Sequence, residues 1–141
     1  MCAAAARRLV LVVEDEALLR SAIAGEFQRA GWEVLEASTG EGALVLLEGH
    51  AIDVVFTDIQ LAGHLSGWDL AEAARAERPD MPVIYTSGTA VWRSRMVSGS
   101  RFIAKPYQTE AVLDACQQQA NAGRFGAWQR RPQNTRPFRA C

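Results

Sequence analysis

The stretch VVFTDIQL, from Val54 to Leu61, decides the fold, because an apolar run here leads directly into one acidic residue. An unbroken apolar run is typical of a strand covered on both faces, as in a parallel sheet. Asp58 then falls where such a strand ends. A carboxylate in that position is costly unless another group compensates for it, so the rest of the chain must supply that group.

Two other stretches supply candidates. Near the start, LVLVVEDE runs from Leu9 through apolar residues to Glu14 and Asp15. Near the end, RFIAKP leads to Lys105, which is the only lysine in a chain whose other basic residues are all arginine. In an open α/β sheet, ligands sit outside the carboxyl ends of the strands. We therefore expect these acids, Asp58 and the lysine to form one site.

Strand and helix patterns alternate along the rest of the chain, with capping residues Ser38 and Ser66 opening two of the helices. The predicted strands are 9–13, 33–37, 52–57, 82–86 and 101–104. The predicted helices are 17–30, 39–48, 67–77, 90–97 and 108–120. Right-handed crossovers turn this order into one architecture. The sequence predicts an α/β fold of the (βα)5, flavodoxin-like type, with a five-stranded parallel sheet and helices on both faces.

The helical pattern stops near residue 121, and Pro132 and Pro137 then interrupt a segment rich in Arg, Asn and Gln. A segment with few periodic apolar residues cannot bury enough surface to order itself. At 141 residues the chain fits one domain. We predict a domain over 8–121 and a flexible, Arg-rich C-terminal tail over 122–141.

Composition excludes several classes of protein. Residues 9–120 contain all sixteen acids and only eight bases, which disfavours DNA binding by the body of the chain. The three cysteines are far apart, so neither a disulfide framework nor a zinc site is indicated. No apolar run approaches the roughly 20 residues that a membrane span needs. The sequence predicts a soluble, cytoplasmic protein without membrane contact.

Three carboxylates in one small site repel one another, and a hard divalent cation relieves that repulsion. Mg²⁺ prefers oxygen ligands, so Asp15 and Asp58 are the predicted direct ligands and Glu14 is predicted to act through water. Lys105 adds a positive charge that could pair with Asp58 or with a phosphoryl group on it. Ser87, at the end of the fourth predicted strand, can offer its hydroxyl to a phosphate oxygen.

Over about residues 8–120 the chain resembles the receiver domains of response regulators, the CheY-like family. Its KPYQTEAVL stretch is similar to the start of the family's last helix. The anchors stand in family order and at family-like spacing, so the resemblance is specific. They are the acid pair Glu14 and Asp15, the phosphoacceptor Asp58, the hydroxyl residue Ser87, the aromatic switch Phe102, and the pair Lys105-Pro106.

The resemblance implies a signalling switch rather than a conventional enzyme. A sensor histidine kinase or a histidine phosphotransfer protein would pass phosphoryl to Asp58 with Mg²⁺, by self-catalysed transfer and with slow autodephosphorylation. The backbone carbonyl of Gln60 would be a further metal ligand. Ser87 and Phe102 would be the switch residues, and their movement would signal to a downstream protein target. The resemblance is also compatible with a homodimer. The bond before Pro106 would be cis.

Two departures from the family concern the loops. Ala62 stands where the family often has proline, and the loop up to Gly67 is about one residue longer than usual. The segment between Ser87 and Lys105 is a few residues short, so the predicted helix over 90–97 is shorter than its family counterpart. This segment and the start of the last helix, 88–112 together, form the predicted output face, with Trp92 and Met96 on its surface.

Four other functional classes share part of this sequence pattern. A haloacid dehalogenase-type phosphatase needs a second aspartate two residues after Asp58, where Gln60 stands. A flavodoxin-like or nucleotide binder needs small residues after the first strand, where acids stand. A DNA-binding regulator needs a further domain, and no helix-turn-helix domain follows residue 120. The remaining alternative is an unphosphorylated pseudo-receiver that acts as a protein interaction module, and the complete acid set with Lys105 argues against it.

Overall fold

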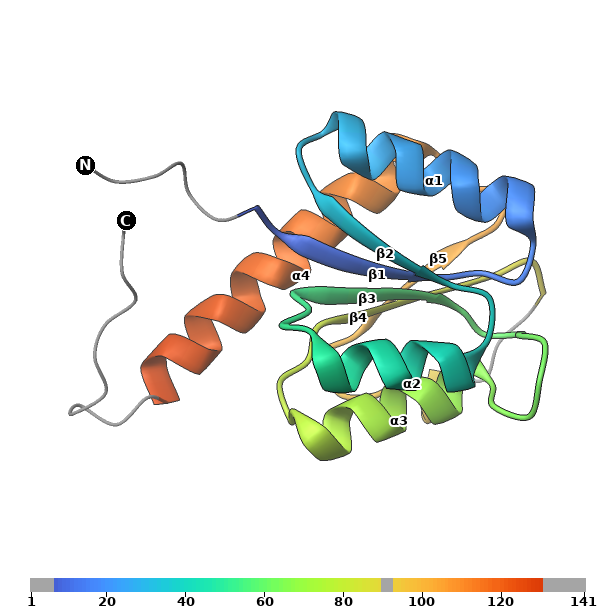
Figure 1. Ribbon diagram of the computed structural model, residues 1–141. Helices are drawn as coiled ribbons and strands as arrows, with labels where there is room; N and C mark the ends of the chain where they lie inside the picture. The colour runs from blue at the N-terminus through green and yellow to red at the C-terminus, as the bar shows by residue number, and fades with distance from the viewer. Residues whose placement is uncertain (1–6, 90–92, 131–141) are drawn as a thin grey trace.

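The computed structural model of the chain describes residues 7–89 and 93–130, and for 93 and 123–130 the backbone alone. One sheet of five parallel strands forms its centre, in the order β2-β1-β3-β4-β5 (Figure 1). The fold class predicted from the sequence is confirmed. The strands are β1 (Leu9–Val13), β2 (Glu33–Ala37), β3 (Val54–Asp58), β4 (Val83–Ser87) and β5 (Arg101–Ala104).

Helices cover both faces of the sheet. In Figure 1, α2 and α3 lie on one face while α1 and α4 lie on the other. Each face has its own apolar core, centred on residues such as Leu11 and Tyr85 on the first and Val12 and Phe27 on the second. The helices are α1 (Ala17–Arg29), α2 (Gly40–Gly49), α3 (Gly67–Glu77) and α4 (Thr109–Arg130). Within the described ranges, no helix has the length and hydrophobicity needed to cross a membrane.

The two predicted capping boxes have different outcomes. Ser66 and Asp69 form the box predicted for α3, since each side chain bonds the backbone N–H of the other residue. For α2 the prediction of Ser38 is wrong, because the cap is Thr39, whose hydroxyl accepts from the N–H of Gly42 at 3.0 Å. Strand β2 ends at Ala37 as predicted, and α2 begins at Gly40, one residue later than predicted.

The last helix extends farther than its apolar pattern. It runs to Arg130 rather than ending near Ala120. Gly123 and Gly126 each weaken a helix by about 1 kcal/mol relative to alanine but do not terminate it, and no proline occurs between Thr109 and Arg130. Part of the predicted tail is therefore helical, and the rest, 131–141, lies outside the described residues.

The segment after β4 contains a 3-10 turn, η1 (Arg93–Arg95), where the sequence predicted a helix over 90–97. Residues 90–92, which include Trp92, lie outside the described residues. Met96 is half-buried and packs on the core beneath α2 and α3. The short spacing noted in the sequence leaves little room here for a longer helix.

Polar contacts hold this short segment on the body. The hydroxyl of Tyr85 accepts from the N–H of Val97 at 3.1 Å. Arg95 pairs with Asp69 at 3.4 Å and with Glu72 at 3.2 Å, both on α3. The segment between β4 and β5 is thus tied to the buried core and to α3.

Gly67 allows α3 to begin directly behind the end of β3. A Cβ atom at this position would lie 2.3 Å from the carbonyl oxygen of Asp58, and the Gly67 N–H donates to the Ile59 carbonyl at 2.7 Å. Gly67→Ala is therefore expected to lower the free energy of unfolding by about 2–3 kcal/mol, because the backbone must move to admit the methyl group. Urea unfolding measures this change.

Gly25→Ala is the matched control for that prediction. A Cβ atom at Gly25, inside α1, would meet nothing closer than the Arg29 side chain at 3.7 Å. This variant should be neutral or more stable by up to about 1 kcal/mol. Equal stability of the two variants would contradict the close approach inferred at Gly67.

Candidate functional site

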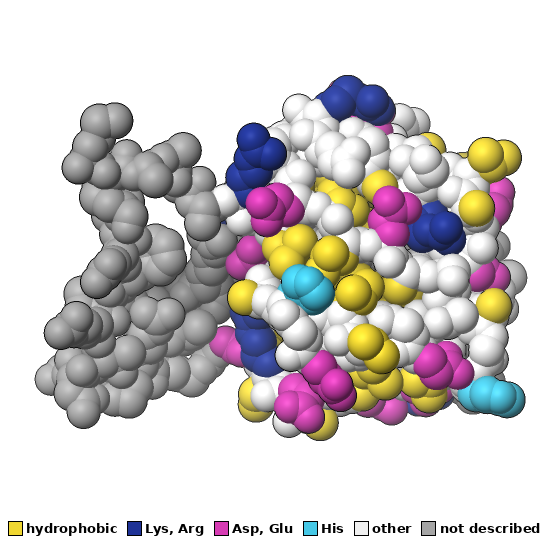
Figure 2. Space-filling model, in the orientation of Figure 1, with side chains coloured by type: hydrophobic (Ala, Val, Ile, Leu, Met, Phe, Trp, Pro, Cys, Tyr) yellow, Lys and Arg dark blue, Asp and Glu magenta, His cyan; other side chains and the backbone are white. Residues whose placement is uncertain are grey.

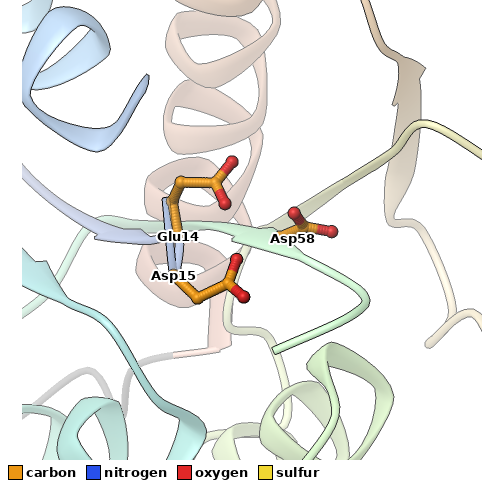
Figure 3. Close-up of side chains that lie close together, drawn as sticks. All are labelled: Glu14, Asp15 and Asp58. Carbon is orange, nitrogen blue, oxygen red and sulfur yellow. The ribbon is translucent and has the colours of Figure 1, made fainter. Parts of the chain in front are cut away.

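Three carboxylates converge at the carboxyl ends of β1 and β3. Glu14 and Asp15 directly follow β1, and Asp58 is the last residue of β3 (Figure 3). Each offers an oxygen that lies within 4.8 Å of the others. Glu14 and Asp58 are buried, with 4% and 6% of their surface exposed, while Asp15 faces solvent. The structure therefore brings together the three acids singled out in the sequence.

Lys105 reaches into this acid cluster from the residue after β5. Its Nζ donates to Glu14 Oε1 and to Asp58 Oδ2, each at 2.7 Å. Burial lowers the pKa of Lys105, but the hydrogen bonds to Asp58 and Glu14 outweigh this effect, so its pKa is raised. The lysine remains charged and links β5 to the ends of β1 and β3.

Backbone and arginine contacts position the acids. The Glu16 N–H donates to Glu14 Oε2 at 3.2 Å, and the Arg20 guanidinium donates to the Glu14 carbonyl at 2.8 Å. Burial raises the pKa of Glu14, against the opposing effect of its hydrogen bond from Lys105. Sequence reasoning missed Arg20, although its place one turn into the helix after the acids was a usable signal.

Asp58 receives a further hydrogen bond from the loop that follows it. The Gln60 N–H donates to Asp58 Oδ1 at 3.1 Å, while Lys105 occupies Oδ2. Gln60 itself is exposed at this edge of the sheet. Its carbonyl as a metal ligand stays a prediction.

Ser87 ends β4 beside the cluster and is 1% exposed. Its Oγ lies 3.1 Å from Thr89 Oγ1 and accepts from the Thr89 N–H, also at 3.1 Å. The Ser87 carbonyl accepts from the Lys105 N–H at 2.9 Å. Thr89 was missed, although a hydroxyl residue commonly accepts from the N–H two residues later.

Phe102 lies on β5, three residues before Lys105, and is half-buried against the core beneath α2 and α3. It is the cross-strand partner of Tyr85, which is fully buried and packs on Trp68 with ring centroids 4.8 Å apart. The structure thus places Phe102 in the core behind the site rather than in the acid cluster. The Lys105–Pro106 bond is cis, as the resemblance implied.

A cavity of about 580 Å³ opens beside the cluster, between the loop after β3 and the segment after β4. Ser87 and Thr89 line one side of it, and Trp68 and Arg95 line another. Ser87 therefore stands between the acid cluster and open space. This leaves room for its hydroxyl to change partners.

The cluster suits a hard divalent cation. Its ligands are carboxylate oxygens, and one of the three acids is exposed enough to leave room for water, as Mg²⁺ requires. Lys105 supplies only one positive charge for three negative ones. The residues present therefore fit Mg²⁺.

Known proteins share this fold and sequence pattern. Residues 10–117 match the family model described as the response regulator receiver domain. A response regulator receiver protein from Sinorhizobium medicae is 35% identical, with a TM-score of 0.79, over 83% of this chain and 97% of that one. The likeness thus covers nearly all of a solved receiver protein.

Two curated relatives are longer proteins. The transcriptional regulatory protein PdtaR of Mycobacterium tuberculosis is 31% identical over 116 residues, which are 79% of this chain and 56% of that protein. The nitrogen assimilation regulatory protein NtrX of Azorhizobium caulinodans is 28% identical over 74% of this chain but only 24% of its own length.

The family model covers most of the chain, and the acids and lysine of the resemblance meet in one site. Receiver domains are signalling modules of two-component systems rather than conventional enzymes. The chain belongs to the response regulator receiver domain family.

Proposed function

We propose that this chain is a phosphoacceptor response regulator that takes a phosphoryl group on Asp58. The observation that supports this most directly is the position of Lys105, whose Nζ lies 2.7 Å from both Glu14 and Asp58. The Lys105 ammonium group, held between these carboxylates at the end of a strand, can also bind the oxygens of a phosphoryl group placed on Asp58.

The chain's residues can carry out the transfer in ordinary steps. An oxygen of Asp58 attacks phosphorus, and the bond between phosphorus and the imidazole nitrogen of a donor histidine breaks with its electron pair left on that nitrogen. Lys105 and the Ser87 hydroxyl then hold phosphoryl oxygens. Asp15, Asp58 and the Gln60 carbonyl would hold Mg²⁺, which when bound neutralises charge on the transferring group.

The remaining features follow from this role. The phosphodonor is a sensor histidine kinase or a histidine phosphotransfer protein, and the target is a downstream protein in the cytoplasm. Transfer is self-catalysed and the acyl phosphate hydrolyses slowly. The functional unit is the receiver domain over 8–121. The second candidate function is that of a pseudo-receiver that acts only by binding. Such a protein would not need the complete acid set with its lysine.

The test is incubation with acetyl phosphate and Mg²⁺, followed by intact mass measurement. We expect the mass to rise by one phosphoryl group that hydroxylamine removes, because acyl phosphates are labile to this nucleophile. Asp58→Asn should abolish the gain, while the exposed Asp114→Asn on α4 should keep it. Labelling that persists in Asp58→Asn would rule out this acceptor, and no labelling of the natural chain would favour the pseudo-receiver.

Mg²⁺ alone is expected to raise the melting temperature of the unphosphorylated protein. Binding to the folded state only stabilises it by mass action, by about 1.4 kcal/mol when the concentration reaches ten times Kd. Asp15→Asn should weaken this response, and Glu110→Gln on the exposed start of α4 should not. The same shift in Asp15→Asn as in the natural chain would place the cation elsewhere.

A further inference from the structure

A groove lies between the C-terminal halves of α2 and α3, at the edge of the sheet opposite the acid cluster. Its volume is about 500 Å³. Ile52 and Met81, just before β3 and β4, place the groove at the amino ends of these strands. Its apolar lining includes Leu44, Leu47, Ile52, Ala73, Ala74 and Met81. Figure 2 shows hydrophobic side chains gathered over α2 and α3, with acidic side chains around them.

The charges at the groove favour a basic occupant. Glu48 and Glu77 line it, are exposed, and have no ion pair within the part of the chain that the structure describes. Arg78 also lines it but is engaged with Asp80 at 3.3 Å and with the Ile52 carbonyl at 2.6 Å. An apolar floor between two carboxylates fits a large apolar side chain flanked by arginines.

The chain carries that pattern itself. The sequence Arg136-Pro137-Phe138-Arg139 sets an apolar pair between two arginines, within residues 131–141 that the structure does not describe. The groove has the complementary arrangement, with apolar residues between Glu48 and Glu77. The charges of this segment are thus opposite to those of the two glutamates at the groove.

The course of α4 delivers this segment to the groove's edge of the sheet. The Arg8 guanidinium, next to the start of β1, donates to the Gln117 carbonyl at 3.3 Å and also contacts Asn121. The helix continues to Arg130, roughly 13 Å farther at 1.5 Å per residue. Figure 1 shows α4 leaving the body on the same side as the ends of α2 and α3. An extended chain from 131 to 138 spans up to roughly 28 Å.

We propose that the segment after α4 docks in the α2–α3 groove of the same chain. Phe138 fills the apolar floor, and Arg136 and Arg139 pair with the rim carboxylates of Glu48 and Glu77. Attachment through α4 makes the association intramolecular, so modest contacts are enough to populate it. This contact does not depend on phosphorylation and stands apart from the proposed phosphoacceptor role.

A nitroxide spin label on Cys141 of the full chain tests the docking. Cys2→Ser removes the other terminal thiol, while Cys116 is fully buried and burial raises its pKa, so it resists labelling. In a dilute sample we expect strong paramagnetic broadening of the amide signals of Leu47 and Met81. Phe138→Ala should lower the equilibrium constant for docking about tenfold or more, because an aromatic side chain loses its burial.

The rim glutamates supply a second measurement. Changing both Glu48→Gln and Glu77→Gln should weaken the broadening, and Glu110→Gln at the opposite edge should leave it unchanged. Uniform weak broadening over the whole surface would overturn the proposal. Broadening that arises only between a spin-labelled chain and a separate isotope-labelled chain would also overturn it, in favour of docking between two copies.

Discussion

Replacement of Lys105 by methionine is expected to lower the free energy of unfolding by about 2–3 kcal/mol in the absence of Mg²⁺. The ammonium group donates to Glu14 and Asp58 at 2.7 Å each, and both acids are almost fully buried. Removing one partner of a buried ion pair typically costs about 3–5 kcal/mol, because charge is left uncompensated. Lys105 keeps 21% of its side chain exposed, so water moderates the loss.

The same variant should respond more strongly to Mg²⁺ than the natural chain. Lys105 competes for the oxygens that a cation would use, so its removal leaves Glu14 and Asp58 without their shared ammonium partner. Urea unfolding with and without Mg²⁺ measures both effects. Stability unchanged by Lys105→Met, or equal gains from Mg²⁺ in both proteins, would contradict this account of the cluster.

Two further variants separate charge from packing. Adding Glu14→Gln to Lys105→Met should recover part of the lost stability, because one of the stranded charges is then gone. Arg101→Met is the matched control, since this exposed base pairs only with Gln118 among the contacts described for it. Arg101→Met is expected to change stability by less than about 0.5 kcal/mol.

The acid cluster could be predicted from sequence because the topology of the sheet alone brings its residues to the same edge. Each apolar run ends in a polar residue at the same edge of a parallel sheet, so Glu14, Asp58 and Lys105 meet without any detailed knowledge of packing. The strands could also be predicted, because short unbroken apolar runs in a chain of this length are typical of buried parallel strands.

Features set by alternatives of nearly equal energy were harder to predict. Serine and threonine are both good helix caps, so the sequence alone does not decide between Ser38 and Thr39. The extension of α4 to Arg130 could not be predicted, because apolar residues no longer recur at helical spacing there. The hydrogen bonds of Ser87 to Thr89 depend on the loop conformation, which the sequence leaves open.

Ser87→Ala is expected to leave phosphoryl uptake in place but to abolish the response of residues 93–104 to a phosphoryl mimic such as beryllofluoride. A phosphoryl group adds about -1.5 to -2 charge and three acceptor oxygens beside Asp58. To donate to them, the Ser87 hydroxyl hydrogen must point toward the site, so it cannot donate to Thr89 Oγ1 at the same time. Without the hydroxyl, Ser87 has no side-chain donor for the phosphoryl oxygens.

The route from that strand to the surface passes through Tyr85. It is two residues before Ser87 on the same face of β4, is the cross-strand partner of Phe102, and holds the Val97 N–H at 3.1 Å. A shift at the end of β4 therefore alters the packing of Phe102 and the anchor of the 93–100 segment together. Amide exchange and NMR shifts report both, and Ser21→Ala on the exposed part of α1 is the control.

Phosphorylation supplies enough free energy for a near-complete switch only if several hydrogen bonds contribute together. Driving a two-state equilibrium from one percent to ninety-nine percent needs roughly 5.5 kcal/mol, and charge-assisted hydrogen bonds supply about 1.5–3 kcal/mol each. Lys105 and Ser87 together come close to that requirement. Arg95 opposes the change, because its pairs with Asp69 and Glu72 hold the short segment on α3. If beryllofluoride shifts the signals of Asp58 and Lys105 but not those of 93–104, those pairs resist the switch and the signal leaves through another face.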